Sequence, residues 1–183
     1  MKKIIIMAIA LAASAISTTT FAQKTKMVGG AAMYPSKDIV DNAVNSKDHT
    51  TLVAAVQAAG LVATLKSEGP FTVFAPTNAA FNKLPEGTVG TLVKPENKAM
   101  LTKILTYHVI AGRFSSKDIA KAIKAGNGTA EFKTVSGGKI WGMMKGKKLI
   151  LKDETGATAA VTIADVFQKN GVIHVIDSVV MPK

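Results

Sequence analysis

The chain of 183 residues has a formal net charge of +11 at pH 7 and no cysteine, which excludes disulfide cross-links and a cysteine nucleophile. Arg113 is the only arginine among its 23 basic residues and aromatic residues make up only 5% of it, so we expect no nucleic-acid partner, because nucleic-acid readers depend on arginine and interleaved aromatic side chains. The lysine-rich composition suits weakly specific attraction to anionic polysaccharides or other acidic surface molecules, or else a solvated surface with no dedicated partner.

Residues 1–22 have the pattern of a signal peptide. Lys2 and Lys3 precede the apolar run Ile4–Ile16, which is short for a membrane span, and small residues lead up to Ala22. We therefore expect export to the periplasm or the cell surface, with cleavage after Ala22 and no stable insertion in the membrane. A membrane anchor is the alternative that this segment leaves open.

The remainder is long enough for one well-packed domain, which we place over residues 36–183. Residues 23–35 are predicted to form an irregular lead-in, because small residues, a pair of glycines and a proline interrupt any regular pattern. A short helix follows from about Ser36, and the helical spacing of apolar residues predicts a longer one over residues 52–66. His49 lies beside the start of the longer helix, where we expect it to face solvent.

The stretch that begins at Phe71 predicts a buried strand with an abrupt end. Side chains alternate along a strand, so Phe71 and Phe74 lie on opposite faces, and a strand that is apolar on both faces belongs inside the domain. Pro76 has no N–H and ends the hydrogen bonding of the strand, and Thr77 or Asn78 can then cap a helix. Nothing in this corner is chemically reactive, so we interpret it as structural.

A helix predicted over residues 96–107 carries His108 on the continuation of its apolar face. A histidine in this position is usually a core residue with a hydrogen-bonded ring nitrogen. We prefer that interpretation to a ligand or a catalytic group, because no carboxylate or second ligand lies at a suitable spacing. Val109 and Ile110 then continue the chain as a strand.

In the last third of the chain the sequence pattern changes from one typical of helices to one typical of β-strands. A capping box that pairs Ser115 with Asp118 starts the last helix, which is expected to bury Ile119 and Ile123. Turn residues then separate four short runs of strand-forming residues. The predicted strands of this meander are residues 131–135, 139–144, 147–152 and 159–163.

Trp141 is the candidate contact residue of this meander. In an alternating strand it shares a face with Lys139 and Met143, and Lys147 and Lys148 follow in the adjoining turn and strand. An indole beside ammonium groups suits sugar rings that carry carboxylates. We favour the alternative, ordinary packing of Trp141 in the core, because indoles are highly buried on average.

The last strand is predicted over residues 172–180, after the tight turn Asn170-Gly171, and it is apolar on both faces. His174 lies within it and is expected to be a core residue. Along a strand His174 and Ser178 share one face while Asp177 points to the other, so the three do not form a catalytic triad. No catalytic residue is therefore predicted, and the histidines lack metal-ligand spacing, so neither a metal nor another cofactor is expected.

Three segments together resemble the signature of the fasciclin (FAS1) domain. Phe71–Phe81, which reads Phe-Thr-Val-Phe-Ala-Pro-Thr-Asn-Ala-Ala-Phe, resembles the first block, and Asn170–Pro182 is similar to the second. Tyr107-His108 is similar to the tyrosine–histidine motif between them, and the resemblance covers about residues 36–183. It implies an α+β fold, a compact wedge with a β core and a flanking layer of helices, used outside the cell for adhesion and ligand binding.

The resemblance also implies roles for individual residues. Tyr107 and His108 match a motif implicated in integrin contact in animal relatives, which makes them candidate contact residues. Asp165-Val166 approximates a second adhesive dipeptide, and no Arg-Gly-Asp is present. The residues that carry the structural part of the signature are Phe71, Phe74, Pro76, Thr77, Asn78, Asn170, Gly171, His174 and Asp177.

These observations favour a secreted, non-catalytic module for adhesion. Its expected partner is a polysaccharide or protein of the cell surface or matrix, anionic in character, and the module itself is expected to be a monomer or a weak oligomer. One alternative is a hydrolase that acts on polysaccharide- or lignin-linked esters. Another is a periplasmic binder of a small ligand or of haem, with Met143, Met144 or His108 in the site.

Overall fold

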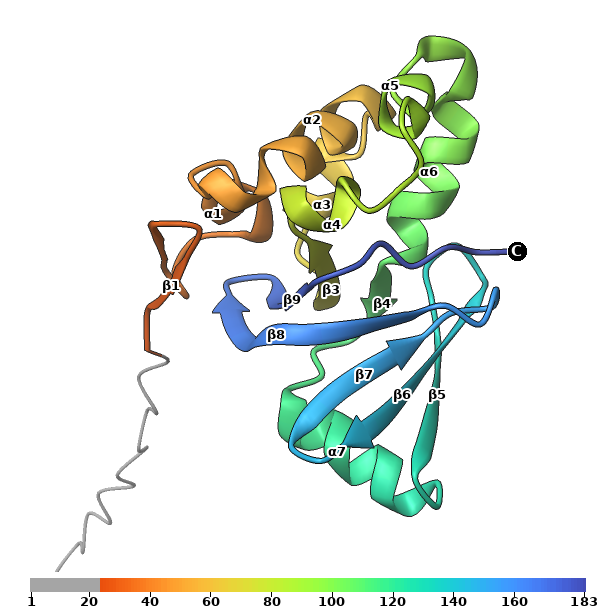
Figure 1. The fold of residues 1–183 in the computed structure, drawn as a ribbon. Coiled ribbons are helices and arrows are strands. Elements are labelled where there is room, and N and C mark those ends of the chain that lie inside the picture. The colour runs from red at the N-terminus through yellow and green to blue at the C-terminus, as the bar shows by residue number, and fades with distance from the viewer. Residues whose placement is uncertain (1–23) are drawn as a thin grey trace, which may run out of the picture.

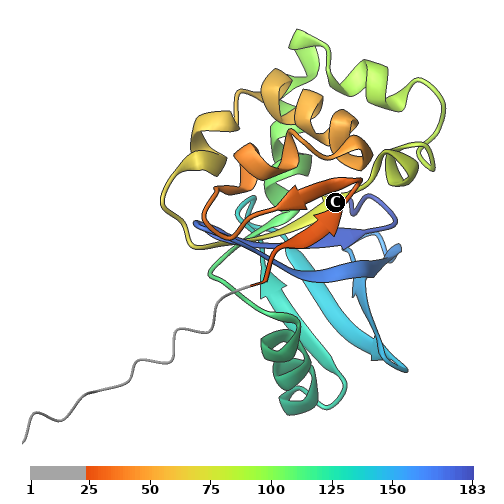
Figure 2. The same cartoon turned by 90° about the vertical axis from the view of Figure 1, so that its left-hand side faces the viewer.

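The computed structural model describes residues 24–183, so the predicted signal peptide lies outside the described residues. A seven-stranded sheet forms the centre of the domain. A layer of helices from residues 39–107 covers one part of this sheet, and a single later helix packs on another part (Figures 1 and 2). This is the α+β architecture that the sequence predicts. No helix within residues 24–183 combines the length and the apolar character needed to cross a bilayer.

The N-terminal segment contains a β-hairpin. β1 (Lys26–Val28) and β2 (Ala31–Met33) pair antiparallel, and the last residue of each strand is buried. Gly29 and Gly30 between them have φ values of +57° and +76°, as in the two-residue type I′ turn that suits the twist of paired strands. The irregular lead-in predicted over residues 23–35 is therefore wrong for this part, because the glycine pair makes a hairpin turn.

The helical layer starts with short elements. They are α1 (Ile39–Ala43), the 3-10 turn η1 (Lys47–His49), α2 (Thr50–Ala59) and α3 (Val62–Lys66). The single helix predicted over residues 52–66 is thus two helices. Gly60 adopts the left-handed conformation, with φ +74°, and so ends α2 two residues before α3 begins at Val62.

His49 is buried, contrary to the prediction that it faces solvent. The residue is only 1% exposed, and its Nδ1 lies 2.9 Å from the Oγ of Ser46. It makes no side-chain hydrogen bond to the first turn of α2. A residue that precedes a helix can point either outward or inward, and here the η1 turn directs it into the interior.

The corner that follows the first central strand forms as predicted. β3 (Phe71–Pro76) ends at Pro76, and Thr77 caps α4 (Asn78–Phe81) by accepting a hydrogen bond from a backbone N–H of that helix. The remaining helical elements are α5 (Thr88–Leu92), the 3-10 turn η2 (Pro95–Asn97), α6 (Lys98–Tyr107) and α7 (Ser116–Ala125). α6 matches the helix predicted before His108.

The sheet brings the two long signature segments together. Its other strands are β4 (Val109–Ala111), β5 (Thr129–Lys133), β6 (Lys139–Lys145), β7 (Lys148–Lys152), β8 (Thr158–Gln168) and β9 (Gly171–Ile176), in the order β4-β3-β9-β8-β7-β6-β5. β3 and β9 run parallel, with Phe71 opposite Gly171 and Pro76 opposite Ile176. The predicted meander corresponds to the antiparallel strands β5–β8.

β3 is buried because each of its faces belongs to a different core. Val73 and Ala75 join the first core, which lies beneath the helical layer, while Phe74 points into the second. The second core fills the space between α7 and the inner face of β5–β7, where Ile119 and Ile140 are buried. The sequence-based interpretation of β3 as an interior strand is confirmed.

Candidate functional site

The outer face of the meander carries a strip of partly exposed apolar side chains. Cross-strand pairing aligns Glu131 with Trp141 and Trp141 with Lys152, and it places Met143 opposite Ile150 in the next row. Trp141, Met143 and Ile150 are half-buried, whereas Ile140, Leu149 and Leu151, at alternate positions of the same strands, are buried in the second core. The indole therefore lies on the solvent side of the sheet, not in the core.

Lysines surround this strip. Lys133 pairs with Lys139 across β5 and β6, and Lys145 pairs with Lys148 across β6 and β7, while Lys147 is exposed in the turn between them. Like charges directly opposite each other destabilise a sheet, so this arrangement costs folding free energy. We use the name Trp141 face for the outward-facing residues Glu131, Lys133, Lys139, Trp141, Met143, Lys145, Lys148, Ile150 and Lys152.

Glu131 organises one end of the Trp141 face. Its Oε1 lies 2.9 Å from the Nζ of Lys139, and its Oε2 accepts a hydrogen bond of 3.2 Å from the Nε1 of Trp141. The indole edge and one ammonium group are thus held by a single carboxylate. The sequence analysis missed Glu131 and Lys133 as members of this face. They occupy alternate positions of β5, so they can be assigned to the face of Trp141 once the pairing of β5 with β6 is known.

A shallow groove of about 380 Å³ adjoins the indole. One wall is the loop that follows β7, and this loop is anchored by the buried side chain of Asp153. The Oδ1 of Asp153 accepts hydrogen bonds from the backbone N–H groups of Thr155 and Ala157, and its Oδ2 accepts one from Met181. The groove is lined by Thr129, Trp141, Met143, Lys152, Asp153, Glu154, Thr155 and Gly156. Its combination of a flat aromatic surface and a polar rim suits a sugar ring.

Tyr107 is fully buried, so a partner cannot reach its side chain in the folded domain. Its hydroxyl donates to the carbonyl oxygen of Lys139 and accepts a hydrogen bond of 3.1 Å from the N–H of Glu154. Burial, with nearby carboxylates, raises the pKa of Tyr107 to about 12, although the hydrogen bond from Glu154 opposes this rise. The contact role implied by the resemblance is corrected: Tyr107 supports the Trp141 face from beneath.

His108 is also a core residue, as its position on the apolar face of the helix predicts. Its Nδ1 donates to the carbonyl oxygen of Ile104 at 2.8 Å, and its Nε2 accepts from the N–H of Val180 at 3.2 Å. Burial lowers the pKa of His108 to about 4, so the ring is neutral at pH 7. Both nitrogens are occupied, which removes His108 as a direct contact residue and as a ligand.

His174 is buried within β9, as predicted, and the residues around it do not form a triad. Its Nε2 donates to the carbonyl oxygen of Phe114 and its Nδ1 accepts from the N–H of Asp165. Asp177 instead accepts hydrogen bonds from the N–H of Ala160 and the hydroxyl of Ser178. Neither carboxylate orients the imidazole for catalysis.

The remaining candidate side chains do not come together in one site. The carboxylate of Asp165 accepts hydrogen bonds from the backbone and side chain of Ser116, so it fixes the start of α7. Met143 lies on the Trp141 face and Met144 is exposed near the end of β6, whereas His108 is in the core, so these three do not form one site. In the part of the chain that the structure describes, no three His, Asp or Glu side chains gather around a common metal position.

Comparison with known proteins agrees with this architecture. Residues 47–182 match the family model described as Fasciclin domain. The chain is 43% identical over 160 residues to Protein sll1483 of Synechocystis sp., which covers 87% of this chain and 82% of that protein. It is 34% identical over 166 residues to the cell surface glycolipoprotein MPB83 of Mycobacterium bovis, covering 88% of this chain and 68% of that one.

The fold is also similar to a solved structure. The FAS1 domain pair from the insect cell adhesion molecule fasciclin I superposes with a TM-score of 0.70 at 18% identity, over 79% of this chain and 50% of the other. The paired segments β3 and β9 are those that carry the sequence signature. With the family match over most of the described residues, the chain belongs to the fasciclin domain family.

Proposed function

We propose that this protein is an exported, non-catalytic adhesion module that binds anionic polysaccharide of the cell surface or matrix through the Trp141 face. The observation that carries the proposal is the half-buried indole of Trp141, which faces outward and lies opposite Lys152 on the neighbouring strand. Two pairs of lysines lie near it, and in each pair the two lysines face each other across adjacent strands. Such pairs lower folding stability, and a bound polyanion would compensate for their repulsion.

The chemistry of the face suits this class of ligand. A sugar ring has an apolar side that can lie on the indole, and its carboxylate or sulfate groups can approach the surrounding ammonium groups. Exposed charges separated by several ångströms interact weakly at physiological ionic strength. The attraction between the lysines and the polysaccharide is therefore moderate, and it depends little on the order of the sugars along the polymer. These properties fit adhesion to a repeating polymer better than recognition of one protein surface.

Family membership supports a role at the surface. One relative is named as a cell surface glycolipoprotein, and the similar solved structure comes from a cell adhesion molecule. The signal-peptide pattern of residues 1–22 supports export of this chain. The absence of a catalytic role is supported by His108 and His174, whose ring nitrogens are all engaged by backbone groups.

The test is binding to alginate, a polyuronate, with neutral dextran as the matched polymer. The wild-type protein should bind alginate and not dextran, and Trp141→Ala should reduce alginate binding at least fivefold. Because the indole lies on the outer face, the melting temperature of the variant should fall by no more than about 2–4 °C, the equivalent of about 1 kcal/mol. Equal binding to both polymers, or unchanged binding by Trp141→Ala, would contradict the proposal.

A further inference from the structure

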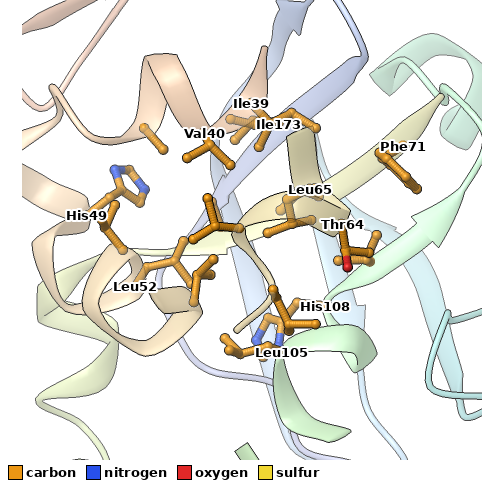
Figure 3. Close-up of a pocket in the computed structure, with 18 of the residues that line it drawn as sticks. Ile39, Val40, His49, Leu52, Thr64, Leu65, Phe71, Leu105, His108 and Ile173 are labelled. Atoms are coloured by element: carbon orange, nitrogen blue, oxygen red, sulfur yellow. The ribbon is translucent and has the colours of Figure 1, made fainter. Parts of the chain in front are cut away.

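A second site lies on the other side of the domain, within the first core. Figure 3 shows apolar side chains from the helical layer and from the sheet around a cavity of about 100 Å³. Val73 and Ala75 of β3 and Ile173 of β9 form part of its lining, and Leu52 and Leu105 approach from α2 and α6. The cavity is therefore separate from the Trp141 face, which lies on the outer side of β5–β7.

The cavity exists because the helical layer is incomplete at α3. Gly60 ends α2, and the five-residue α3 that follows has no fully buried residue. Leu61 and Leu65 pack against the first core but remain partly exposed. Phe71 and Val135, both also partly exposed, contribute to the lining, so the cavity extends toward the surface at this end.

The opposite end of the cavity carries a polar atom that needs a partner. His49 lines the cavity and lies at the left edge of the side chains drawn in Figure 3. Its Nδ1 lies 2.9 Å from Ser46 Oγ, but its Nε2 is buried and has no hydrogen-bond partner among residues 24–183. Leaving a buried polar atom unpaired lowers stability, so a ligand that pairs with Nε2 would recover part of that free energy.

The ring of His49 is neutral at pH 7. Burial lowers the pKa of His49 below its ordinary value, and the nearby backbone of Ala75 and the charge of Asp48 oppose this only in part. No group within residues 24–183 makes a hydrogen bond of normal geometry with Nε2. A neutral imidazole has one donor and one acceptor nitrogen, and the Ser46 hydroxyl can pair with either form. A hydroxyl on the ligand can likewise serve both forms of Nε2.

We propose that this cavity binds a small apolar molecule, the size of a single ring or a short alkyl chain, that carries one hydroxyl group and pairs it with His49 Nε2. The volume is of the same order as that of an engineered cavity of about 150 Å³ whose Leu, Ile and Phe lining binds benzene. Mostly apolar walls with a small number of placed polar groups are the usual composition of small-molecule sites. The inference is independent of polysaccharide binding at the Trp141 face.

Phenol and toluene form a matched pair of probes, because they have nearly the same shape and differ in a hydroxyl and a methyl group. Both should bind in an NMR titration and shift the methyl resonances of Leu52, Leu65 and Ile173. Toluene is the more hydrophobic of the two, so the informative quantity is the ratio of the two dissociation constants in each variant, not either constant alone. No shift with either probe would overturn the proposal.

Two substitutions of His49 distinguish the roles of its two ring nitrogens. His49→Asn keeps a polar atom near the position of Nδ1 and so preserves the contact with Ser46, but it removes Nε2. His49→Gln reaches the position of Nε2 instead. The preference for phenol over toluene should fall about three- to tenfold in His49→Asn, as expected for one lost hydrogen bond, and should be retained at least in part in His49→Gln. If the ratio of the two dissociation constants is unchanged in His49→Asn, then His49 does not bind the hydroxyl of the ligand and the proposal is wrong.

Filling the cavity tests its location. Ala43→Leu on α1 adds three carbon atoms at a lining position and should abolish binding of both probes. Val44→Leu, at the adjacent exposed position, adds a methylene outside the cavity and should leave binding unchanged. Val53→Leu, which enters from α2, is the second filling variant if Ala43→Leu melts at a lower temperature than wild type. Retention of binding in both filling variants would place the ligand elsewhere and contradict the proposal.

Discussion

The hydroxyl of Tyr107, at the end of α6, donates a hydrogen bond to the backbone carbonyl of Lys139, the first residue of β6. The same oxygen accepts a hydrogen bond from the N–H of Glu154 in the loop after β7. One buried side chain therefore joins the helical layer to both the strand and the loop that border the Trp141 face. The tyrosine of the family motif therefore acts on the Trp141 face through the backbone.

Tyr107→Phe should destabilise the domain by about 1–3 kcal/mol, because it leaves the carbonyl of Lys139 and the N–H of Glu154 without this partner while preserving the ring. Urea denaturation monitored by circular dichroism measures the change. Thr106→Ser, at the neighbouring position on α6, is the control and should change stability by less than about 1 kcal/mol. A variant as stable as wild type would show that the hydroxyl contributes nothing to this junction.

His108→Ala and His174→Ala should each lower the melting temperature by several degrees. Each substitution removes a buried ring and leaves two backbone groups unpaired, a change that costs about 2–5 kcal/mol in typical cores. In a domain of this size 1 kcal/mol corresponds to about 2–4 °C. Differential scanning calorimetry at pH 7 provides the comparison, and wild-type melting of both variants would contradict the structural role assigned to these histidines.

Stability should decrease as the pH falls from about 6.5 to 4. His108 has a pKa of about 4 in the folded domain but its ordinary value near 6.5 when unfolded, so the unfolded chain binds the proton first in this range. The free energy of unfolding therefore rises with pH through this window and levels off above it. Burial also lowers the pKa values of His49 and His174, which act in the same direction. His108→Ala should show a shallower pH dependence in urea titrations, and an equal slope would exclude His108 as a source.

Reversing the charge of Lys147 and Lys148 to Glu should reduce binding to alginate at least tenfold with little effect on stability. The residues are exposed, and substitutions at exposed positions usually change stability by no more than about 0.5 kcal/mol. The control is the same reversal at Lys94 and Lys98, which changes the net charge equally but lies in the helical layer. Wild-type binding should also weaken between low and physiological salt, where exposed charges are screened over about 8 Å. Equal losses in the two double variants would indicate attraction by net charge alone.

Glu131→Gln should strengthen binding to alginate about two- to fivefold. The amide oxygen can still accept the hydrogen bond from Trp141 Nε1, but the negative charge is removed and Lys139 is released from its ion pair. Glu96→Gln is the matched control, since it removes one exposed carboxylate from η2 in the helical layer without releasing Lys139. Weaker binding by Glu131→Gln would imply that Glu131 itself contacts the sugar.

Elements that depend on neighbouring residues in the sequence were predicted well. The cap of Thr77 on α4 and the capping box between Ser115 and Asp118 form as expected, because their hydrogen bonds close within three residues. The interior character of β3 and β9 also follows from apolar residues at alternating positions. The Gly29-Gly30 turn also depends only on neighbouring residues, so the hairpin could have been predicted from the sequence. It was missed because the two glycines were interpreted only as an interruption of regular structure.

The candidate sites depend on contacts between distant segments. The partnership of Glu131 with Trp141 and Lys139 requires the register of β5 against β6, which the sequence of either strand does not specify. The burial of His49 follows from the way η1 turns beneath the helical layer, and the cavity beside it follows from the short α3.

The sequence by itself therefore determined the helix caps, the interior strands and the core positions of His108 and His174, because these follow from local hydrogen bonding and hydrophobic pattern, and the resemblance of its signature segments indicated the family. Only the tertiary structure decided that Tyr107 is a support and that the half-buried Trp141 faces outward, because exposure depends on which surfaces the distant strands and helices cover.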